Sequence, residues 1–119
     1  MEYPQHMIEA LMMILHNNDK AICEATGDES QPDWLNVEQW QRDSCMEGIR
    51  FIVNNPDATA SALHDNWMKD KLANGWVYCE VKDANAKTHP CLMPFHDLSL
   101  DMQIKNHVFK STVKTLLNL

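Results

Sequence analysis

The residues of greatest chemical interest lie in the run NGWVYCEVKDANAKTHPCLMPF, residues 74–95. Aromatic and cationic side chains alternate in it without the period of a helix or of a regular strand. These side chains are Trp76, Tyr78, Lys82, Lys87 and His89. Rings beside cations suit a flat, anionic ligand, because the rings stack on a planar group and the cations meet its charge. The same residue types also hold an irregular loop on a hydrophobic core, so the pattern alone leaves both interpretations open.

Four potential metal ligands fall in or beside the same run, namely Cys79, His89, Cys91 and His96. Structural zinc sites pair their ligands two to four residues apart on both sides of a loop, whereas here only His89 and Cys91 are close. We therefore expect no metal ion and no cofactor. We interpret the four cysteines of the chain as free thiols, because a chain of this size with a hydrophobic core does not need disulfides.

Enzymatic chemistry finds little support in the residue pattern. Cys91 or Ser61 with His64 or His89 would supply a nucleophile and a base, but no acidic orienting group or oxyanion loop accompanies them. The chain has only three glycines, which are too scattered to form a phosphate-binding loop. The sequence thus favours a binding protein over an enzyme.

Charge excludes one class of partner. The chain has 119 residues and a net charge of −7 at pH 7, and its only arginines are Arg42 and Arg50. Such a chain offers no broad basic surface for DNA or RNA, although two or three cations in a pocket can still hold a small anion. No apolar run approaches the roughly 20 residues that span a bilayer, and no secretion signal opens the chain. We expect a soluble, cytoplasmic protein with one domain over residues 1–119 and no membrane partner.

Helices must position most of these residues. Apolar side chains recur at helical spacing over residues 7–25, and Gly27 is the expected stop. Asn36 is the expected N-cap of a second helix, which Pro56 ends and whose apolar stripe includes Trp40.

A third helix is expected over residues 59–74, opened by Thr59 or Ser61 and ended by Gly75. The next residues read as a short hairpin-like strand pair or loop, and Ser99 caps a last helix. The expected buried stripe of the last helix is Ile104, Val108, Phe109, Val113, Leu116 and Leu117. The predicted fold is therefore mainly α, with four helices and a short two-strand or loop insert before the last one.

Four tryptophans are many for this length. Trp40 and Trp76 fit core positions, so we expect at least two tryptophans in the core. Trp67 lies at the edge of an apolar stripe, with Asp70 and Lys71 at helical spacing, and can face a pocket.

The run HDNWMKDKLANGWVYCEVKDANAKTHPCLMPF, residues 64–95, resembles the core signature of the RyR domain. This repeat was first described in ryanodine receptor channels and also occurs as a stand-alone module in bacteria and phages. The matching elements are His64 with Trp67, Gly75-Trp76-x-Tyr78, Val81-Lys82-Asp83, Lys87-Thr88-His89-Pro90-Cys91-Leu92, and Pro94 before an aromatic residue. Residues 27–58 resemble the N-terminal half of the bacterial and phage versions. Two positions depart from the family pattern: Cys79 replaces a usual glycine, and Lys105-Asn106 replaces a usual Lys-Asp pair.

The resemblance implies a mainly helical fold with a small strand pair and no catalytic activity. It also implies that the position of Trp67 lies in a cleft suited to adenine-type ligands. In prokaryotes the module is associated with nucleotide-derived signals in antiviral defence. The channels carry these modules in pairs, so we expect a lone copy to form a homodimer in which two copies of Trp67 clamp a planar base.

We therefore hypothesise a non-enzymatic binder of a nucleotide-derived ligand, such as an adenine nucleotide or a cyclic nucleotide messenger, that acts as a sensor or sequestering protein. The predicted ligand-binding residues are Trp67, Lys71, Tyr78, Lys82, His89 and Arg42. Trp67 would stack on the base and the cationic groups would meet phosphate, while Trp76 and Pro90 would serve as framework. The alternative is a protein–protein interaction module without a small ligand. A weaker third reading is a phosphodiesterase-like or deaminase-like enzyme.

Overall fold

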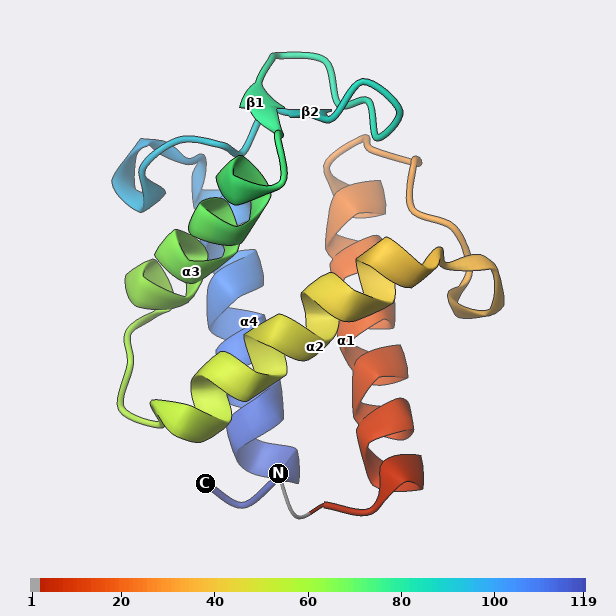
Figure 1. Ribbon diagram of the computed structural model, residues 1–119, viewed down its shortest axis with the longest axis vertical. Coiled ribbons are helices and arrows are strands. Elements are labelled where there is room, and N and C mark those ends of the chain that lie inside the picture. The colour runs from red at the N-terminus through yellow and green to blue at the C-terminus, as the bar shows by residue number, and fades with distance from the viewer. Residues whose placement is uncertain (1–2) are drawn as a thin grey trace.

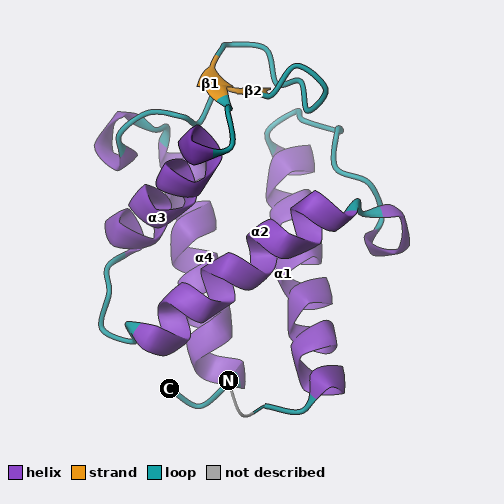
Figure 2. Ribbon diagram, in the orientation of Figure 1, coloured by secondary structure: helices purple, strands orange, loops and turns teal. Residues whose placement is uncertain are grey.

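The computed structural model describes residues 3–119 and is mainly helical, as predicted (Figures 1 and 2). The helices are α1 (Gln5–Ala25), α2 (Gln39–Asn54), α3 (Ala60–Ala73) and α4 (Leu100–Leu116). The strands β1 (Val77–Tyr78) and β2 (Thr88–His89) lie between α3 and α4, and 3-10 turns span Trp34–Asn36 and Phe95–Asp97. The prediction of four helices with a two-strand insert before the last one is therefore confirmed. No helix within residues 3–119 is long and apolar enough to cross a membrane.

The four helices surround one hydrophobic core. Helix α1 packs against α4, α2 crosses both of them, and α3 packs on α2 and α4 (Figure 1). The β1–β2 segment lies at one end of the bundle, above the C-terminal ends of α1 and α3 (Figure 2). The buried core residues are Ile8, Leu11, Met12, Leu15, Ile49, Ile52, Leu63, Val113 and Leu117. All four helices or their immediate ends thus contribute to the core.

Helices α1 and α3 end in the same way. After each helix a glycine takes a positive φ, which is +93° for Gly27 and +86° for Gly75. The N–H of the following residue then donates to a carbonyl in the last turn, from Asp28 to Cys23 over 2.8 Å and from Trp76 to Lys71 over 3.0 Å. This is the Schellman arrangement, in which glycine avoids the steric penalty that other residues pay in the left-handed region. Both stop signals read from the sequence are confirmed.

The predicted N-caps are confirmed for two helices and wrong for one. The Thr59 hydroxyl accepts from the Ala62 N–H over 3.1 Å, and the Ser99 hydroxyl accepts from the Met102 N–H over 3.3 Å. Asn36, in contrast, lies in a 3-10 turn, and α2 begins three residues later. The chain between them is extended at Val37, which buries that side chain in the bundle.

The hairpin prediction is wrong, because β1 and β2 pair in parallel. Val77 pairs with Thr88, and Tyr78 pairs with His89. The chain reverses twice between the strands rather than once. A carboxylate oxygen of Asp83 accepts from the N–H groups of Asn85 at 2.9 Å and Ala86 at 3.3 Å, and so fixes an additional turn.

Some expected core positions are exposed. Trp40, placed in the core by its helical spacing, is 39% exposed, and Trp76 is the only tryptophan of residues 3–119 that is buried, at 7%. In α4 and its C-cap, Val113 and Leu117 are buried, whereas Ile104 and Leu116 are exposed. Helical spacing identifies the faces of a helix, but which face meets a neighbour depends on the packing of the whole bundle. All four cysteines are free, as predicted.

Candidate functional site

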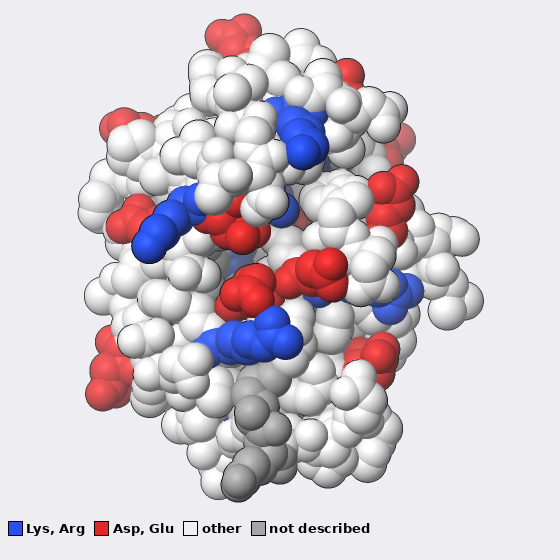
Figure 3. All heavy atoms as spheres, viewed as in Figure 1, with Lys and Arg blue, Asp and Glu red and all other residues white. Residues whose placement is uncertain are grey.

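A cavity of about 270 Å³ lies between the helices and the β1–β2 segment. Helices α1, α2, α3 and α4 all contribute to its wall, and the segment before α4 adds His89 and Cys91. All four tryptophans of the chain line it, namely Trp34, Trp40, Trp67 and Trp76. Acidic and basic side chains both gather around the hollowed centre of the face seen in Figure 3. An apolar hollow with a few convergent polar groups is the usual form of a small-molecule site.

A chain of aromatic contacts forms one wall of the cavity. The ring centroids of Trp40 and Trp76 lie 5.3 Å apart, and those of Trp76 and His89 lie 6.4 Å apart. His89 in turn meets the ring of Trp67 edge-on at 5.1 Å. On its other side Trp67 stacks with His64 at 5.5 Å, with the ring planes 27° apart. These offset and edge-on geometries are the favourable ones for aromatic pairs, so the wall is held by its own contacts.

Lys71 places a buried cation against this wall. The residue is only 6% exposed, and its ammonium lies 5.0 Å from the ring centroid of Trp40 and 5.3 Å from that of Trp76. Among the described residues, no acceptor lies within hydrogen-bonding distance of its Nζ, and no carboxylate forms an ion pair with it. Burial lowers the pKa of Lys71, and the neighbouring charge of Asp70 opposes that change. The cation is therefore held by aromatic faces alone.

His89 is fixed in one neutral form. Its Nδ1 accepts a hydrogen bond from the N–H of Cys91 over 3.0 Å, which places the ring proton on Nε2. Burial lowers the pKa of His89 to about 3, and the charges of Lys82, Lys105 and Lys71 act in the same direction. At neutral pH the imidazole is thus an uncharged donor in the wall of the cavity.

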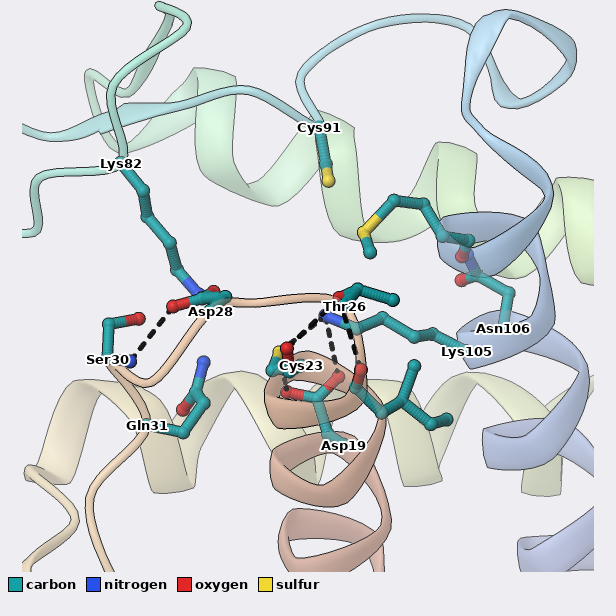
Figure 4. A network of polar contacts seen from close by, with 12 residues as sticks. Asp19, Cys23, Thr26, Asp28, Ser30, Gln31, Lys82, Cys91, Lys105 and Asn106 are labelled. Atoms are coloured by element: carbon teal, nitrogen blue, oxygen red, sulfur yellow. Dashed lines mark hydrogen bonds and ion pairs between the residues drawn. The ribbon is translucent and has the colours of Figure 1, made fainter.

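Two ion pairs form a polar end of the cavity (Figure 4). The Lys82 ammonium lies 3.1 Å from a carboxylate oxygen of Asp28, which follows the last turn of α1. The Lys105 ammonium, on α4, lies 3.2 Å from Asp19 and also donates to the Cys23 thiol over 2.9 Å. Side chains from α1, α4 and the loop after β1 therefore point toward one another at this end.

The pKa directions agree with these pairings. Burial alone would raise the pKa of Asp28, but hydrogen bonds from Ser30 and Lys82 hold it below its usual range. Burial alone would lower the pKa of Lys105, but the charge of Asp19 and the contact with Cys23 raise it to about 12. Both lysines of the polar end therefore already have a carboxylate partner. Within residues 3–119, no group of three or more His, Cys, Asp or Glu side chains is placed to hold a metal ion.

Comparison with known protein families identifies the fold. The model of the RyR domain matches residues 50–119, which is more than half of the chain. The chain belongs to the RyR domain family. Membership supports a ligand-binding or protein-interaction module in general. The matched segment of this RyR domain supplies Trp67, Lys71, Trp76 and His89, whereas Trp40 and all of α1 lie before it.

The RyR domain brings four of the six predicted binding residues together. Trp67, Lys71, Lys82 and His89 all line the cavity. Tyr78 does not: it lies on β1 and is 51% exposed.

Arg42 is also outside the wall of the cavity. Its guanidinium lies 4.0 Å from the ring centroid of Trp34 and donates to the carbonyls of Trp34 at 3.0 Å and Val37 at 3.3 Å. These contacts hold the 3-10 turn before α2, so the guanidinium of Arg42 is already engaged by groups of the same chain.

Several wall residues of the RyR domain escaped the sequence interpretation, among them Trp40, Asp19 and Lys105. A sequence signal existed for the last two. Asp19 lies between Leu15 and Ile22 on the apolar face of α1, and Lys105 lies between Met102 and Phe109 in the same way. A charged residue on an apolar helix face must find a partner, because an unpaired buried charge is costly. Each of these positions therefore indicates a charge that needs a partner, although the sequence does not name that partner.

Proposed function

We propose that this RyR domain binds one small, planar, nucleotide-derived ligand in the tryptophan-lined cavity and releases it unchanged. The observation that supports the proposal is a hollow lined by all four tryptophans, with one buried, unpartnered lysine among them. Stacking on aromatic side chains contributes about 1–3 kcal/mol per base. A protein of this kind acts as a sensor or as a sequestering protein.

Trp67 is the proposed stacking residue. One side of its indole is occupied by His64, and His89 meets it edge-on, so these neighbours hold the ring in place. A planar ligand would pack against the remaining face of the indole. The Nε2–H of His89 would donate to a ring nitrogen or oxygen of the ligand, since Nδ1 is already used by Cys91.

Lys71 is the proposed partner for the anionic group of the ligand. The Lys71 side chain is buried, but its ammonium is not among the fully buried atoms, and in the free protein it contacts only two ring faces and the open cavity. A phosphate oxygen in the cavity would supply the missing hydrogen bonds, and a charge-assisted bond of this kind is about twice as strong as a neutral one. A bound anion would therefore give the Lys71 ammonium a charged partner that no residue of the described chain supplies.

A protein-interaction function is the second candidate, because one surface favours it. Val77, Tyr78 and Val81 are all at least half exposed on the β1–β2 segment. Exposed apolar side chains gathered on one segment are typical of contact surfaces. The homodimer with two facing copies of Trp67 also remains a proposal, and the cavity of one chain already offers several rings to a ligand without it.

A panel of nucleosides, nucleotides, cyclic mononucleotides and cyclic dinucleotides tests the proposal. The melting temperature of the protein and the mass of each ligand would be measured after incubation. We expect a rise in melting temperature with the ligand intact, its loss in Trp67→Ala, and its retention in Tyr78→Ala. No rise with any member, or an altered ligand mass, contradicts the proposal. No rise would leave the interaction module as the better account, and an altered mass would indicate an enzyme.

A further inference from the structure

The cavity is lined by equal numbers of lysines and carboxylates, but not all of them are paired with one another. Three lysines line it, namely Lys71, Lys82 and Lys105, and three carboxylates line it as well, namely Asp19, Glu47 and Asp70. A cavity that takes a polyanion would need an excess of cations, because each added phosphate brings a further negative charge. The numbers alone give no such excess.

Two of the three lysines are already neutralised. Lys82 pairs with Asp28 at 3.1 Å, and Lys105 pairs with Asp19 at 3.2 Å while it also donates to Cys23. A second anion beside either lysine would have to compete with a carboxylate that the fold holds in place. The polar end of the cavity is therefore closer to neutral than its two lysines suggest.

Lys71 differs from both. It is the most buried lysine that the structure describes, and its ammonium meets only the rings of Trp40 and Trp76. Asp70, beside it in the chain, also lines the cavity and makes a second negative group next to Lys71 unfavourable. Glu47 is paired with Arg50 at 2.6 Å, so its negative charge is already neutralised. Among the described residues of the wall, Lys71 is thus the one lysine without a carboxylate ion pair.

We propose that the ligand carries a single negative charge, one phosphodiester group bound at Lys71, and that the cavity rejects nucleoside diphosphates and triphosphates. This inference rests on the proposed function. The cavity volume of about 270 Å³ lies below the usual range of about 300–1,000 Å³ for drug-sized ligands, which also favours a compact mononucleotide. A cyclic mononucleotide combines a planar base with one phosphodiester and has both features.

Calorimetric titration with two purine series tests the inference. Each series, adenine and guanine, contains the nucleoside, its 3′,5′-cyclic monophosphate, the diphosphate and the triphosphate. For the base that the cavity accepts, we expect the cyclic monophosphate to bind at least about tenfold more tightly than the nucleoside and than the triphosphate. Affinity that rises steadily with the number of phosphates overturns this inference and leaves the proposed function intact. No binding in either series overturns this inference, whereas the proposed function fails only if the wider panel, cyclic dinucleotides included, also gives no binding.

Two substitutions and one control variant identify the source of the preference. Lys71→Met keeps the buried aliphatic stem and removes the charge, so it should abolish the preference for the cyclic monophosphate while nucleoside binding persists. Lys69→Met, two residues away on the exposed face of α3, should change neither affinity. Asp70→Asn should reduce the difference in affinity between the cyclic monophosphate and the triphosphate. A Lys71→Met protein that still prefers the cyclic monophosphate about tenfold would contradict the assignment of the charge to Lys71.

Discussion

The backbone N–H of Trp76 donates to the carbonyl of Lys71 over 3.0 Å, and the ammonium of the same lysine lies 5.3 Å from the Trp76 ring. The motif that ends α3 thus fixes the backbone hydrogen bond and also brings the two side chains into contact. The glycine between them lets the chain turn back, so that the indole covers the last turn of α3. The buried cation of the cavity is therefore a consequence of how α3 ends.

Replacement of the Trp76 ring should destabilise the protein strongly. Trp76 is buried and contacts Trp40, His89 and Lys71. Trp76→Ala should lower the free energy of unfolding by about 3–5 kcal/mol, because it removes transfer free energy and leaves a void. Urea denaturation followed by circular dichroism measures the change. A loss below about 1 kcal/mol would show that the ring is not part of the core.

Gly75→Ala should have a smaller effect on stability. An alanine Cβ would meet nothing within 4 Å, so the cost comes from the positive φ of +86° and not from crowding. We expect a loss of about 1–2 kcal/mol in the same denaturation experiment. An unchanged midpoint would mean that the turn after α3 adopts another conformation.

Trp67→Ala should separate binding from folding. Trp67 is only half-buried and lies outside the main core, so its truncation should cost at most about 1–2 kcal/mol of stability. The same change should remove the ligand-induced rise in melting temperature, because the stacking face is lost. A strongly destabilised variant that still responds to ligand would assign Trp67 to the core and binding to another residue.

Stability should fall in acid in a way that depends on His89. Burial holds the pKa of this residue at about 3, below the ordinary 6.5 of the unfolded chain. Between these two values the unfolded state binds more protons than the folded state, so the free energy of unfolding decreases as the pH is lowered from about 6.5 toward 3. One such group contributes at most about 1.4 kcal/mol per pH unit.

His89→Asn isolates this contribution. Asparagine can accept from the Cys91 N–H as Nδ1 does, but it does not titrate. The dependence of unfolding on pH between 6.5 and 3 should be shallower in this variant, while His6→Asn, at an exposed position, should match the parent. Equal slopes for His89→Asn and the parent would contradict a buried neutral imidazole.

Local signals in the sequence were sufficient to predict where several of the helices begin and end. Thr59, Ser99, Gly27 and Gly75 act as predicted because caps and stops depend on a few neighbouring residues. Helical spacing likewise predicted most of the α1 core. Trp67, whose mixed neighbours mark the edge of an apolar stripe, lines the cavity.

The remaining features depend on contacts between distant segments. The pair of Asp19 and Lys105 joins α1 to α4, and no local pattern states which helices become neighbours. Trp40 and Arg42 lie two positions apart on α2, and only the bundle decides that the first faces the cavity and the second the loop before the helix. The parallel pairing of β1 and β2 depends on a turn at Asp83 that reverses the chain a second time.

The most direct test of the tryptophan-lined cavity is a nitrogen-15 NMR titration that follows the four indole N–H signals, assigned by single tryptophan-to-phenylalanine variants. The ligand added is the purine compound that raises the melting temperature most. Because Trp40, Trp67 and Trp76 form the aromatic wall of the cavity, we predict shifts of these three signals that saturate at one ligand per chain. Saturable binding that leaves these signals in place and moves the backbone signals of Val77, Tyr78 and Val81 would contradict the account and place the ligand on the outer surface of the β1–β2 segment.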